Sequence, residues 1–254
     1  MLSDLLVLVP LGVVAGLLSG LLGIGGGLVF SPILLLVGLP PHQALATSTL
    51  AIVPTTLGGT WLHLRQGRVQ PAAGLAIGLS AALSGLLFSQ LGGLLSGWQL
   101  LGLQALMYAT ITLTITPRSG PELEGAEAPA PPWPALALVG SVAGLAGGLL
   151  GVGGGLLMVP LMMGVLRLPV REAIRLSTLA VLCSATAASV TFLALAKAQG
   201  AIALTLGGTA SVAARWSAAR LDRVPETLLV QLLRGLTALL ALDSGRRALS
   251  LLLG

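Results

Sequence analysis

Long apolar stretches follow one another along almost the whole chain. A helix needs about 20 apolar residues to cross the hydrocarbon core of a bilayer, and most of these stretches reach that length. A soluble domain carries about 25% charged residues, whereas this chain of 254 residues has only 8%. Too few charges remain to cover a water-exposed surface, so we predict an all-α integral membrane protein. The stretches run over 5–22, 28–38, 43–63, 71–92, 98–116, 134–150, 156–166, 172–196, 200–219 and 227–245.

Two of these stretches, 28–38 and 156–166, reach only about half the length of a span. Each follows a glycine-rich run, as in SGLLGIGGGLVFSP at 19–32. Glycine costs about 1 kcal/mol in a helix interior and proline about 3 kcal/mol. We therefore expect the chain to turn at the glycines and to continue as a half-length helix.

The glycine-rich run occurs twice, within two copies of one longer unit. Gly25, Gly26 and Gly27 match Gly153, Gly154 and Gly155, and the order of the later matches is also kept. These are Pro32 with Pro160 and, after one inserted residue, Pro40 with Pro169 and Ser48-Thr49 with Ser177-Thr178. The sequence thus divides into a first transmembrane repeat (1–116), a proline- and glutamate-rich cytoplasmic linker (117–133) and a second repeat (134–254). Internal repeats of this kind are typical of transporters.

The distribution of arginines favours inverted repeats. If each glycine-broken segment is a re-entrant hairpin, each half has about three crossing helices and the chain about eight hydrophobic helical segments. Only Lys197, Arg246 and Arg247 then lie on the outer side. Arg234 lies within the last predicted span and is left uncounted. If the broken segment crosses fully, the same twelve charges divide six and six, so the positive-inside rule favours the re-entrant model. The charges that it places in the cytoplasm are Arg65, Arg68, Arg118, Arg167, Arg171, Arg175, Arg215, Arg220 and Arg223.

Broken backbone at membrane depth survives only where protein buries it or where it lines a cavity. A glycine turn followed by a half-helix presents unpaired N–H groups and the positive end of a helix dipole, which together favour an anion. We therefore predict an anion site at Gly25–Gly27 and Gly153–Gly155, entered from opposite faces, with Pro32 and Pro160 in structural roles. Close helix packing is the alternative explanation for such glycines, and it is the one we favour for the small-residue spacings elsewhere.

These residues resemble the sulfite exporter TauE/SafE family of bacterial membrane permeases. The resemblance rests on GxGGG, a proline five residues on, and a span that opens with Ala-Thr-Ser, and it covers nearly the whole chain. It implies a multi-pass protein of the bacterial inner membrane that transports a small sulfur-containing anion such as sulfite, a sulfonate or sulfoacetate. The second repeat departs from the family pattern, because ALATST at 44–49 corresponds to AIRLST at 173–178.

Polar side chains near the glycine turns are further candidates for anion binding. Hydroxyl groups one or two turns into the next span have two readings: they donate to an anion, or they bond to their own helix at i−4. Arg175 suits a sulfonate or carboxylate through its fork of donors, but it equally suits a cytoplasmic anchor. The hydroxyl candidates are Thr47, Ser48, Thr49, Ser177 and Thr178.

Other functional classes find little support in the residues. No GxSxG motif is present, the only histidines, His42 and His63, lie at predicted span ends, and too few ligands lie near them for a metal site. We expect no enzyme activity, cofactor or nucleic-acid partner. No carboxylate is predicted at mid-membrane, which favours an anionic or neutral substrate. An anion channel on the same architecture, the coupling ion (proton or sodium) and a homo-oligomer are left open.

Overall fold

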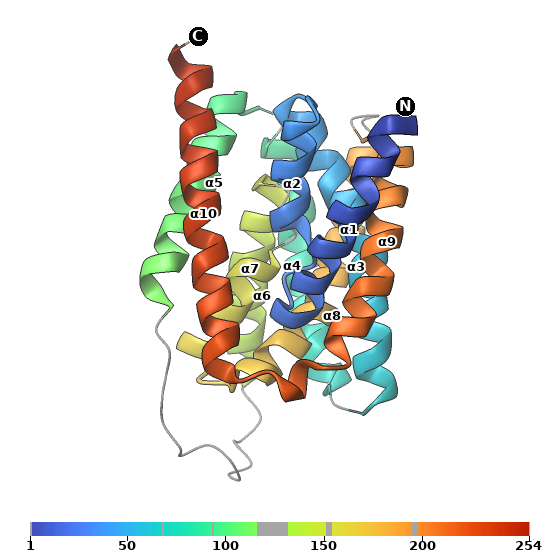
Figure 1. Cartoon of the computed structure of the whole chain (residues 1–254). Helices are drawn as coiled ribbons and strands as arrows, with labels where there is room; N and C mark the ends of the chain where they lie inside the picture. The colour runs from blue at the N-terminus through green and yellow to red at the C-terminus, as the bar shows by residue number, and fades with distance from the viewer. Residues whose placement is uncertain are drawn as a thin grey trace.

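The computed structural model describes residues 2–67, 69–92, 94–115, 132–150, 154–194 and 198–253. Within these ranges the chain forms α-helices joined by short turns and one 3-10 helix, and no strand (Figure 1). The predicted all-α class is therefore confirmed, whereas the predicted linker falls almost wholly outside these ranges. The helices are α1 (Leu2–Leu22), α2 (Gly27–Leu36), α3 (Pro41–Arg65), α4 (Pro71–Gly92), α5 (Gly97–Thr114), α6 (Trp133–Leu150), α7 (Gly155–Gly164), α8 (Val170–Ala194), α9 (Gly200–Ala218), η2 (Leu221–Arg223) and α10 (Glu226–Leu253).

Helix starts follow from local sequence. Proline occupies the first position of α3 and α4, where its missing N–H costs nothing and its fixed φ suits a helix. The start of α5 is a capping box, in which the N–H of Ser96 donates to Oε1 of Gln99 at 2.9 Å. These local signals divide a nearly uniform apolar sequence into separate helices.

The two halves of the chain pack according to one shared scheme. Helix α1 packs against α9, and its counterpart α6 packs against α4, which is the counterpart of α9. In the same way, α3 contacts α9 while α8 contacts α4, and the counterparts α3 and α8 contact each other, as do α5 and α10. Exchanging the halves therefore leaves the set of helix pairs unchanged.

Both half-length helices predicted from the sequence are present. Helices α2 and α7 each have ten residues and contain one proline, Pro32 or Pro160, at the same position. Each runs back against the following long helix, α2 against α3 and α7 against α8. The chain reaches positive φ two residues before the next loop proline in both halves, at Gly38 (φ 93°) and Arg167 (φ 55°).

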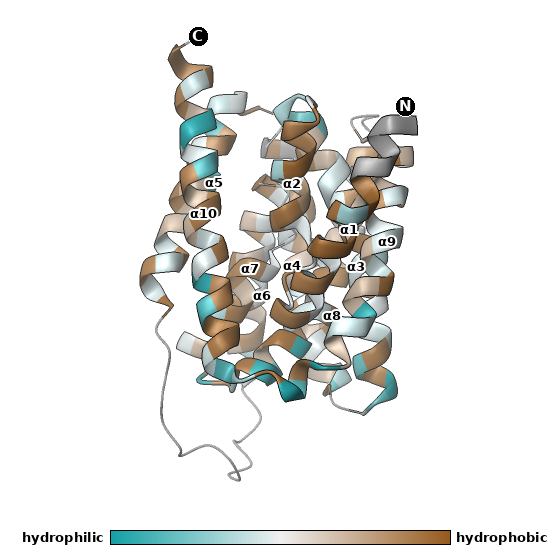
Figure 2. Ribbon diagram, viewed as in Figure 1, coloured by the Kyte–Doolittle hydropathy of each residue, from teal (hydrophilic) through white to brown (hydrophobic). Residues whose placement is uncertain are grey.

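The outer surface of the bundle is apolar. Along α4, for example, Leu79, Leu83 and Leu87 are 60–70% exposed and share one helix face. Figure 2 shows hydrophobic residues over most of the helices and hydrophilic residues gathered at the end of the bundle opposite the two termini. The molecule is a multi-pass membrane protein. Four of its described helices are long and apolar enough to cross a bilayer: Pro71–Ser89, Trp133–Leu150, Val170–Leu193 and Glu226–Leu253.

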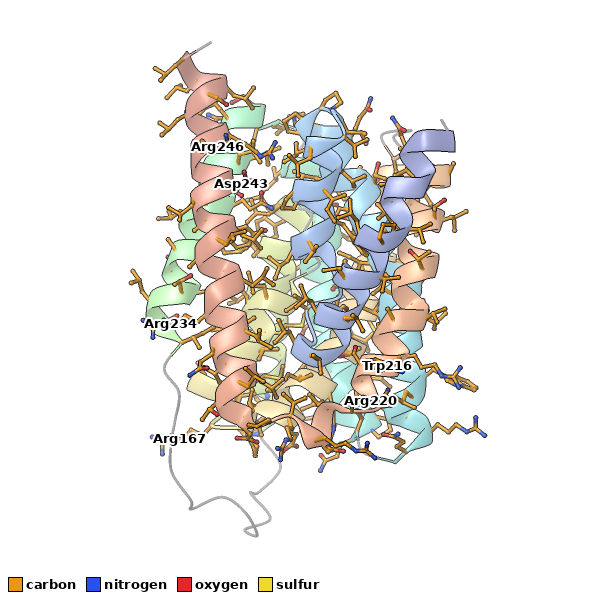
Figure 3. All side chains as sticks on the ribbon, viewed as in Figure 1. Arg167, Trp216, Arg220, Arg234, Asp243 and Arg246 are labelled. Carbon is orange, nitrogen blue, oxygen red and sulfur yellow. The ribbon has the colours of Figure 1, made fainter. Side chains whose placement is uncertain are left out.

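Most charged side chains lie towards the two ends of the bundle, whereas Arg234 lies within α10 (Figure 3). Near the C-terminus, Asp243 accepts from Arg246 at 3.2 Å and from Arg247 at 2.8 Å. At the other end the guanidinium carbon of Arg220 lies 3.5 Å from the ring centroid of Trp216, which is 55% exposed. An aromatic ring with an arginine beside it is typical of the membrane–water interface, so this end of α9 marks one boundary of the bilayer.

Small residues allow the closest helix contacts, and α9 offers a matched test. A Cβ added at Gly207 would lie 2.5 Å from Cγ of Pro54 and 2.6 Å from the carbonyl oxygen of Ala51, whereas one at Gly208 meets nothing within 4 Å. Gly207→Ala should therefore destabilise the protein by about 1–3 kcal/mol through overpacking, while Gly208→Ala leaves it unchanged or slightly more stable. Thermal unfolding in detergent measures the stability of both variants. Equal Tm values would contradict the close contact between Gly207 and α3.

Candidate functional site

The first glycine turn joins α1 to α2 by a series of left-handed residues. Gly23, Gly25 and Gly26 have φ of 67°, 74° and 82°, and Gly26 is the N-cap of α2. Only glycine adopts this region without strain. All three residues are buried, so the predicted break at Gly25–Gly27 is a real turn inside the protein.

The second turn repeats the geometry of the first. Gly154 has φ of 73° and is the N-cap of α7, which begins at Gly155. These two residues match Gly26 and Gly27 in both sequence and conformation. Gly153, the remaining predicted residue of this turn, lies outside the described residues.

Each half-helix begins with N–H groups that have no helical acceptor. The first N–H groups that donate to the N-cap carbonyls are those of Val29, to the carbonyl oxygen of Gly26 at 2.9 Å, and Leu157, to that of Gly154 at 3.1 Å. The preceding residues Gly27 and Leu28, like Gly155 and Leu156, are buried. Their N–H groups belong to the first turn, where an α-helix supplies no partner, and they carry the positive end of the helix dipole.

The prolines leave an unpaired group inside each half-helix as well. Pro32 lacks the N–H that would donate to the carbonyl oxygen of Leu28, four residues earlier, and Pro160 leaves that of Leu156 in the same state. The two half-helices therefore share their length, their N-cap and the position of this missing bond. A structural role for the two prolines stays a prediction, and the bond that each one removes lies in the first turn of its half-helix.

Two serines at equivalent positions hold the glycine turns. The Ser48 hydroxyl on α3 donates to the carbonyl oxygen of Gly27 at 3.2 Å, and the Ser177 hydroxyl on α8 lies 3.3 Å from that of Gly155. Ser177 also donates to the carbonyl oxygen of Gly23 at 2.8 Å. The latter bond joins the second repeat to the turn of the first, so Ser177 links the two halves where both chains are broken.

The three predicted threonines lie beside the serines but point their hydroxyls elsewhere. Thr49 donates to the carbonyl oxygen of Leu45 and Thr178 to that of Ile174, both at 2.8 Å and within their own helices. Thr47 accepts from the N–H of Gln199 at 3.0 Å. In this arrangement Thr49 and Thr178 make the i−4 bonds that compete with anion binding, and Thr47 joins α3 to the start of α9.

The two turns approach each other closely. A Cβ on Gly155 would lie 3.0 Å from the carbonyl oxygen of Gly23 and 3.1 Å from Cα of Ile24. A Cβ on Gly23 would lie 2.5 Å from the carbonyl oxygen of Ile174 on α8. The start of α7 therefore lies against the turn that precedes α2, in the interior of the protein.

Arg175 lies two residues before Ser177 and forms an ion pair with Asp222 of η2. Its neighbour one turn earlier, Arg171, lies 3.9 Å from Oε1 of Glu226 and donates to the carbonyl oxygen of Val224 at 3.1 Å. The Arg175 side chain is only 18% exposed. These bonds fasten the N-terminal end of α8 to the segment between α9 and α10.

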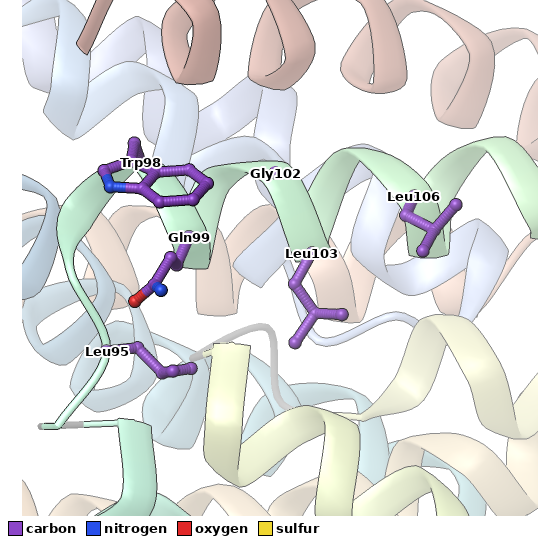
Figure 4. Close-up of a pocket in the computed structure, with 6 residues that line it drawn as sticks. All are labelled: Leu95, Trp98, Gln99, Gly102, Leu103 and Leu106. Carbon is purple, nitrogen blue, oxygen red and sulfur yellow. The ribbon is translucent and has the colours of Figure 1, made fainter. Parts of the chain in front are cut away.

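An open groove lies on α5, away from the predicted site residues (Figure 4). Its volume is about 340 Å³, and its apolar residues Trp98, Leu103 and Leu106 are 39–63% exposed. The only polar side chain that lines it, Gln99, already accepts a bond from Ser96. The groove is therefore mainly apolar and contains none of the residues predicted to bind an anion. In the described part of the chain, no three His, Cys, Asp or Glu residues are grouped closely enough to hold a metal ion.

Paired broken helices inside a multi-pass helical bundle define the architecture of a membrane transporter. The chain belongs to the Sulfite exporter TauE/SafE family, whose model matches residues 8–243. A probable membrane transporter protein of Xylella fastidiosa is 30% identical over 183 residues, 70% of each chain. The probable membrane transporter protein YdhB of Bacillus subtilis is 40% identical over 68 residues, 26% of this chain and 28% of that protein. No solved structure matches the chain significantly.

A third relative carries the family name itself. The Sulfite exporter TauE/SafE family protein 3 of Arabidopsis thaliana is 46% identical over 41 residues, which are 16% of this chain and 9% of that protein. The predicted family is therefore confirmed, and the chain is a membrane transporter of that family. Two features of the site residues were not predicted from the sequence: the second bond of Ser177 and the Asp222 partner of Arg175. A third is Val181 on α8, whose Cγ1 and Cγ2 would lie 2.6 Å and 2.5 Å from Cβ atoms added at Gly25 and Gly155.

Ser177 gives the sharpest test of the link between the turns. Ser177→Ala removes the hydroxyl shared by the carbonyl oxygens of Gly23 and Gly155, so it should destabilise the protein by about 1–2 kcal/mol. Thr186→Ala is the matched control, because Thr186 is exposed on the same helix and bonds only within it, to Leu182. Thermal unfolding in detergent compares the two, and equal losses would contradict a linking role for Ser177.

Proposed function

We propose that the chain is a secondary transporter that moves a small sulfur-containing anion by alternating access. Sulfite, a sulfonate or sulfoacetate is held by the N-terminal ends of α2 and α7, in the inner membrane of a bacterium. One observation carries this proposal: two half-helices have equivalent left-handed glycine N-caps, and the start of α7 lies against the turn that precedes α2 in the interior. Their first N–H groups have no helical acceptor, and such groups bind anions readily.

The buried polar side chains also suit an anion. In the described residues they are serines, threonines, His63 and Gln104, without any aspartate or glutamate. Cation transporters and many proton pumps place carboxylates at membrane depth, and a buried carboxylate would repel an anionic substrate. The site therefore combines backbone donors and hydroxyl groups in a region free of fixed negative charge.

The hydroxyl and arginine candidates take different parts in the proposed mechanism. Ser48 and Ser177 position the turns, whereas Thr47, Thr49 and Thr178 become donors to the anion when their helices shift. Arg175 lies on the approach from the end of the bundle that holds most of the arginines. Its guanidinium exchanges the carboxylate of Asp222 for an incoming sulfonate, since both groups match the same fork of donors.

Inversion of the repeats underlies alternating access in this proposal. The duplication that it requires is supported by three findings: the main helix pairs are kept when the halves are exchanged, the half-helices match, and Ser48 and Ser177 make equivalent bonds. In an inverted arrangement the two half-helices enter from opposite faces and meet near the midplane. Rocking of one repeat against the other then exposes the site to one side at a time.

Anion binding at the turns can be tested by thermal unfolding of the detergent-solubilised protein. A ligand that binds only the folded state adds about 2.7 kcal/mol of stability at a hundred times its Kd. Sulfite or a short sulfonate should therefore raise the Tm, and Gly26→Ala should abolish that rise, because an added Cβ lies 2.8 Å from the Phe30 ring at the start of α2. Gly38→Ala is the control: Gly38 also has positive φ, but its Cβ would meet nothing within 4 Å.

Two outcomes would overturn the anion site. One is an unchanged Tm with every sulfur-containing anion, together with the absence of flux into proteoliposomes. The other is a rise in Tm with an anion that is equally large in Gly26→Ala and in the wild type. Unitary currents in a bilayer recording, in place of slow saturable flux, would identify an anion channel on the same architecture.

Inversion predicts that equivalent loops lie on opposite sides of the membrane. Val37 and Val165 are the C-caps of α2 and α7 and are 40% and 59% exposed. With Cys183 replaced by serine, Val37→Cys should react with a membrane-impermeant maleimide added to spheroplasts, and Val165→Cys should react only after lysis. Labelling of both from the same side would show parallel repeats.

A further inference from the structure

One apolar side chain lies against both glycine turns. Val181 lies on α8, one helical turn after Ser177, and is fully buried. A Cβ on Gly25 would lie 2.6 Å from Cγ1 of Val181, and a Cβ on Gly155 would lie 2.5 Å from its Cγ2. The two methyl groups of this valine therefore face the two turns, one methyl to each.

The first repeat places a related residue at the equivalent position. Ile52 lies one turn after Ser48 on α3, is fully buried, and its Cγ2 would lie 2.9 Å from a Cβ on Gly25. The atoms nearest to a Cβ on Gly155 are, however, those of Val181, Gly23 and Ile24. Within the described residues, Val181 is therefore among the nearest neighbours of Gly25 and of Gly155, whereas Ile52 is among those of Gly25.

Val181 is apolar, whereas the glycine turns that it contacts are rich in hydrogen-bond donors. The starts of α2 and α7 offer N–H donors, whereas methyl groups offer no hydrogen bond. An oxygen of a bound sulfonate group can accept from the N–H donors of one turn. An alkyl substituent that projects from the sulfur towards the other turn then meets Val181. The space available to that substituent therefore depends on the volume of residue 181.

We infer that Val181 sets the size of the anion that the transporter accepts, by limiting the alkyl substituent of a sulfonate bound between the glycine turns. This inference rests on the proposed function. Ser48 and Ser177 hold the turns in place, while Val181 determines what fits between them. A smaller residue at 181 admits longer alkylsulfonates, and a larger one restricts the site to sulfite.

The experiment measures uptake into proteoliposomes and the Tm shift for sulfite and the series from methanesulfonate to butanesulfonate. One methylene in an apolar pocket changes selectivity by roughly 10-fold or more. Val181→Ala should raise the uptake ratio of butanesulfonate to sulfite by about 10-fold or more, and Val181→Leu should lower the ratio of methanesulfonate to sulfite to a similar extent. Val190→Ala is the matched control, because Val190 lies on the same helix and is 63% exposed.

The outcomes separate this inference from the proposed function. Wild-type protein that neither binds nor transports any of these anions contradicts the proposed function itself. Wild-type protein that transports them, with a chain-length profile unchanged in Val181→Ala and Val181→Leu, overturns the role of Val181 alone. A change in the chain-length profile that Val190→Ala also produces overturns it, because such a change would reflect a general destabilisation of α8. If Val181→Ala does not fold, Val181→Leu and the nearly isosteric Val181→Thr, which should keep the wild-type profile, decide the question.

Discussion

The rest of the structure depends on burying broken backbone inside a membrane protein. Lipid offers no hydrogen bonds, so a turn at this depth must be covered by protein or line a cavity. Here each turn is covered by the other and by α3 and α8. The carbonyl oxygens of Gly23, Gly27 and Gly155 receive serine hydroxyls, while the N–H groups at the start of α2 and α7 receive no helical acceptor. The carbonyl acceptors of the turns thus have hydrogen-bond partners, whereas the N–H donors at the helix starts have no partner within their helices.

Backbone conformation and close packing explain why glycine recurs at these positions. The left-handed conformation of Gly26 and Gly154 reverses the chain, and the missing Cβ lets the turns approach within van der Waals contact. Helices α3 and α8 then each contribute a serine and, one turn later, a branched apolar residue. A single local pattern therefore supplies both the fastening of the turn and the lining of the space beside it. Because the pattern is duplicated, each repeat contributes one serine and one branched apolar residue beside the glycine turns.

Much of this arrangement is readable from the sequence, because glycine and proline act locally. The half-length stretch predicted at 156–166 corresponds to α7 at Gly155–Gly164, and the break predicted at Gly25–Gly27 is the N-cap of α2. Bonds between distant segments were not readable. Asp222 lies 47 residues from Arg175, and Gly23 lies 154 residues from Ser177. A hydroxyl near a helix start has several acceptors within reach, so only the packed structure shows which one it uses.

The repeats also differ where they meet their surroundings. Arg171 and Arg175 occupy the positions of His42 and Ala46, and they pair with Glu226 and Asp222. The start of α3 is instead joined to α9 by neutral groups, through the bonds of Gln199 to Thr47 and Gln43. In the proposed inverted arrangement these two ends face different compartments, and arginine is enriched only on the cytoplasmic side. Equivalence is therefore strongest at the glycine turns, which share one buried environment, and weakest at the helix ends, which do not.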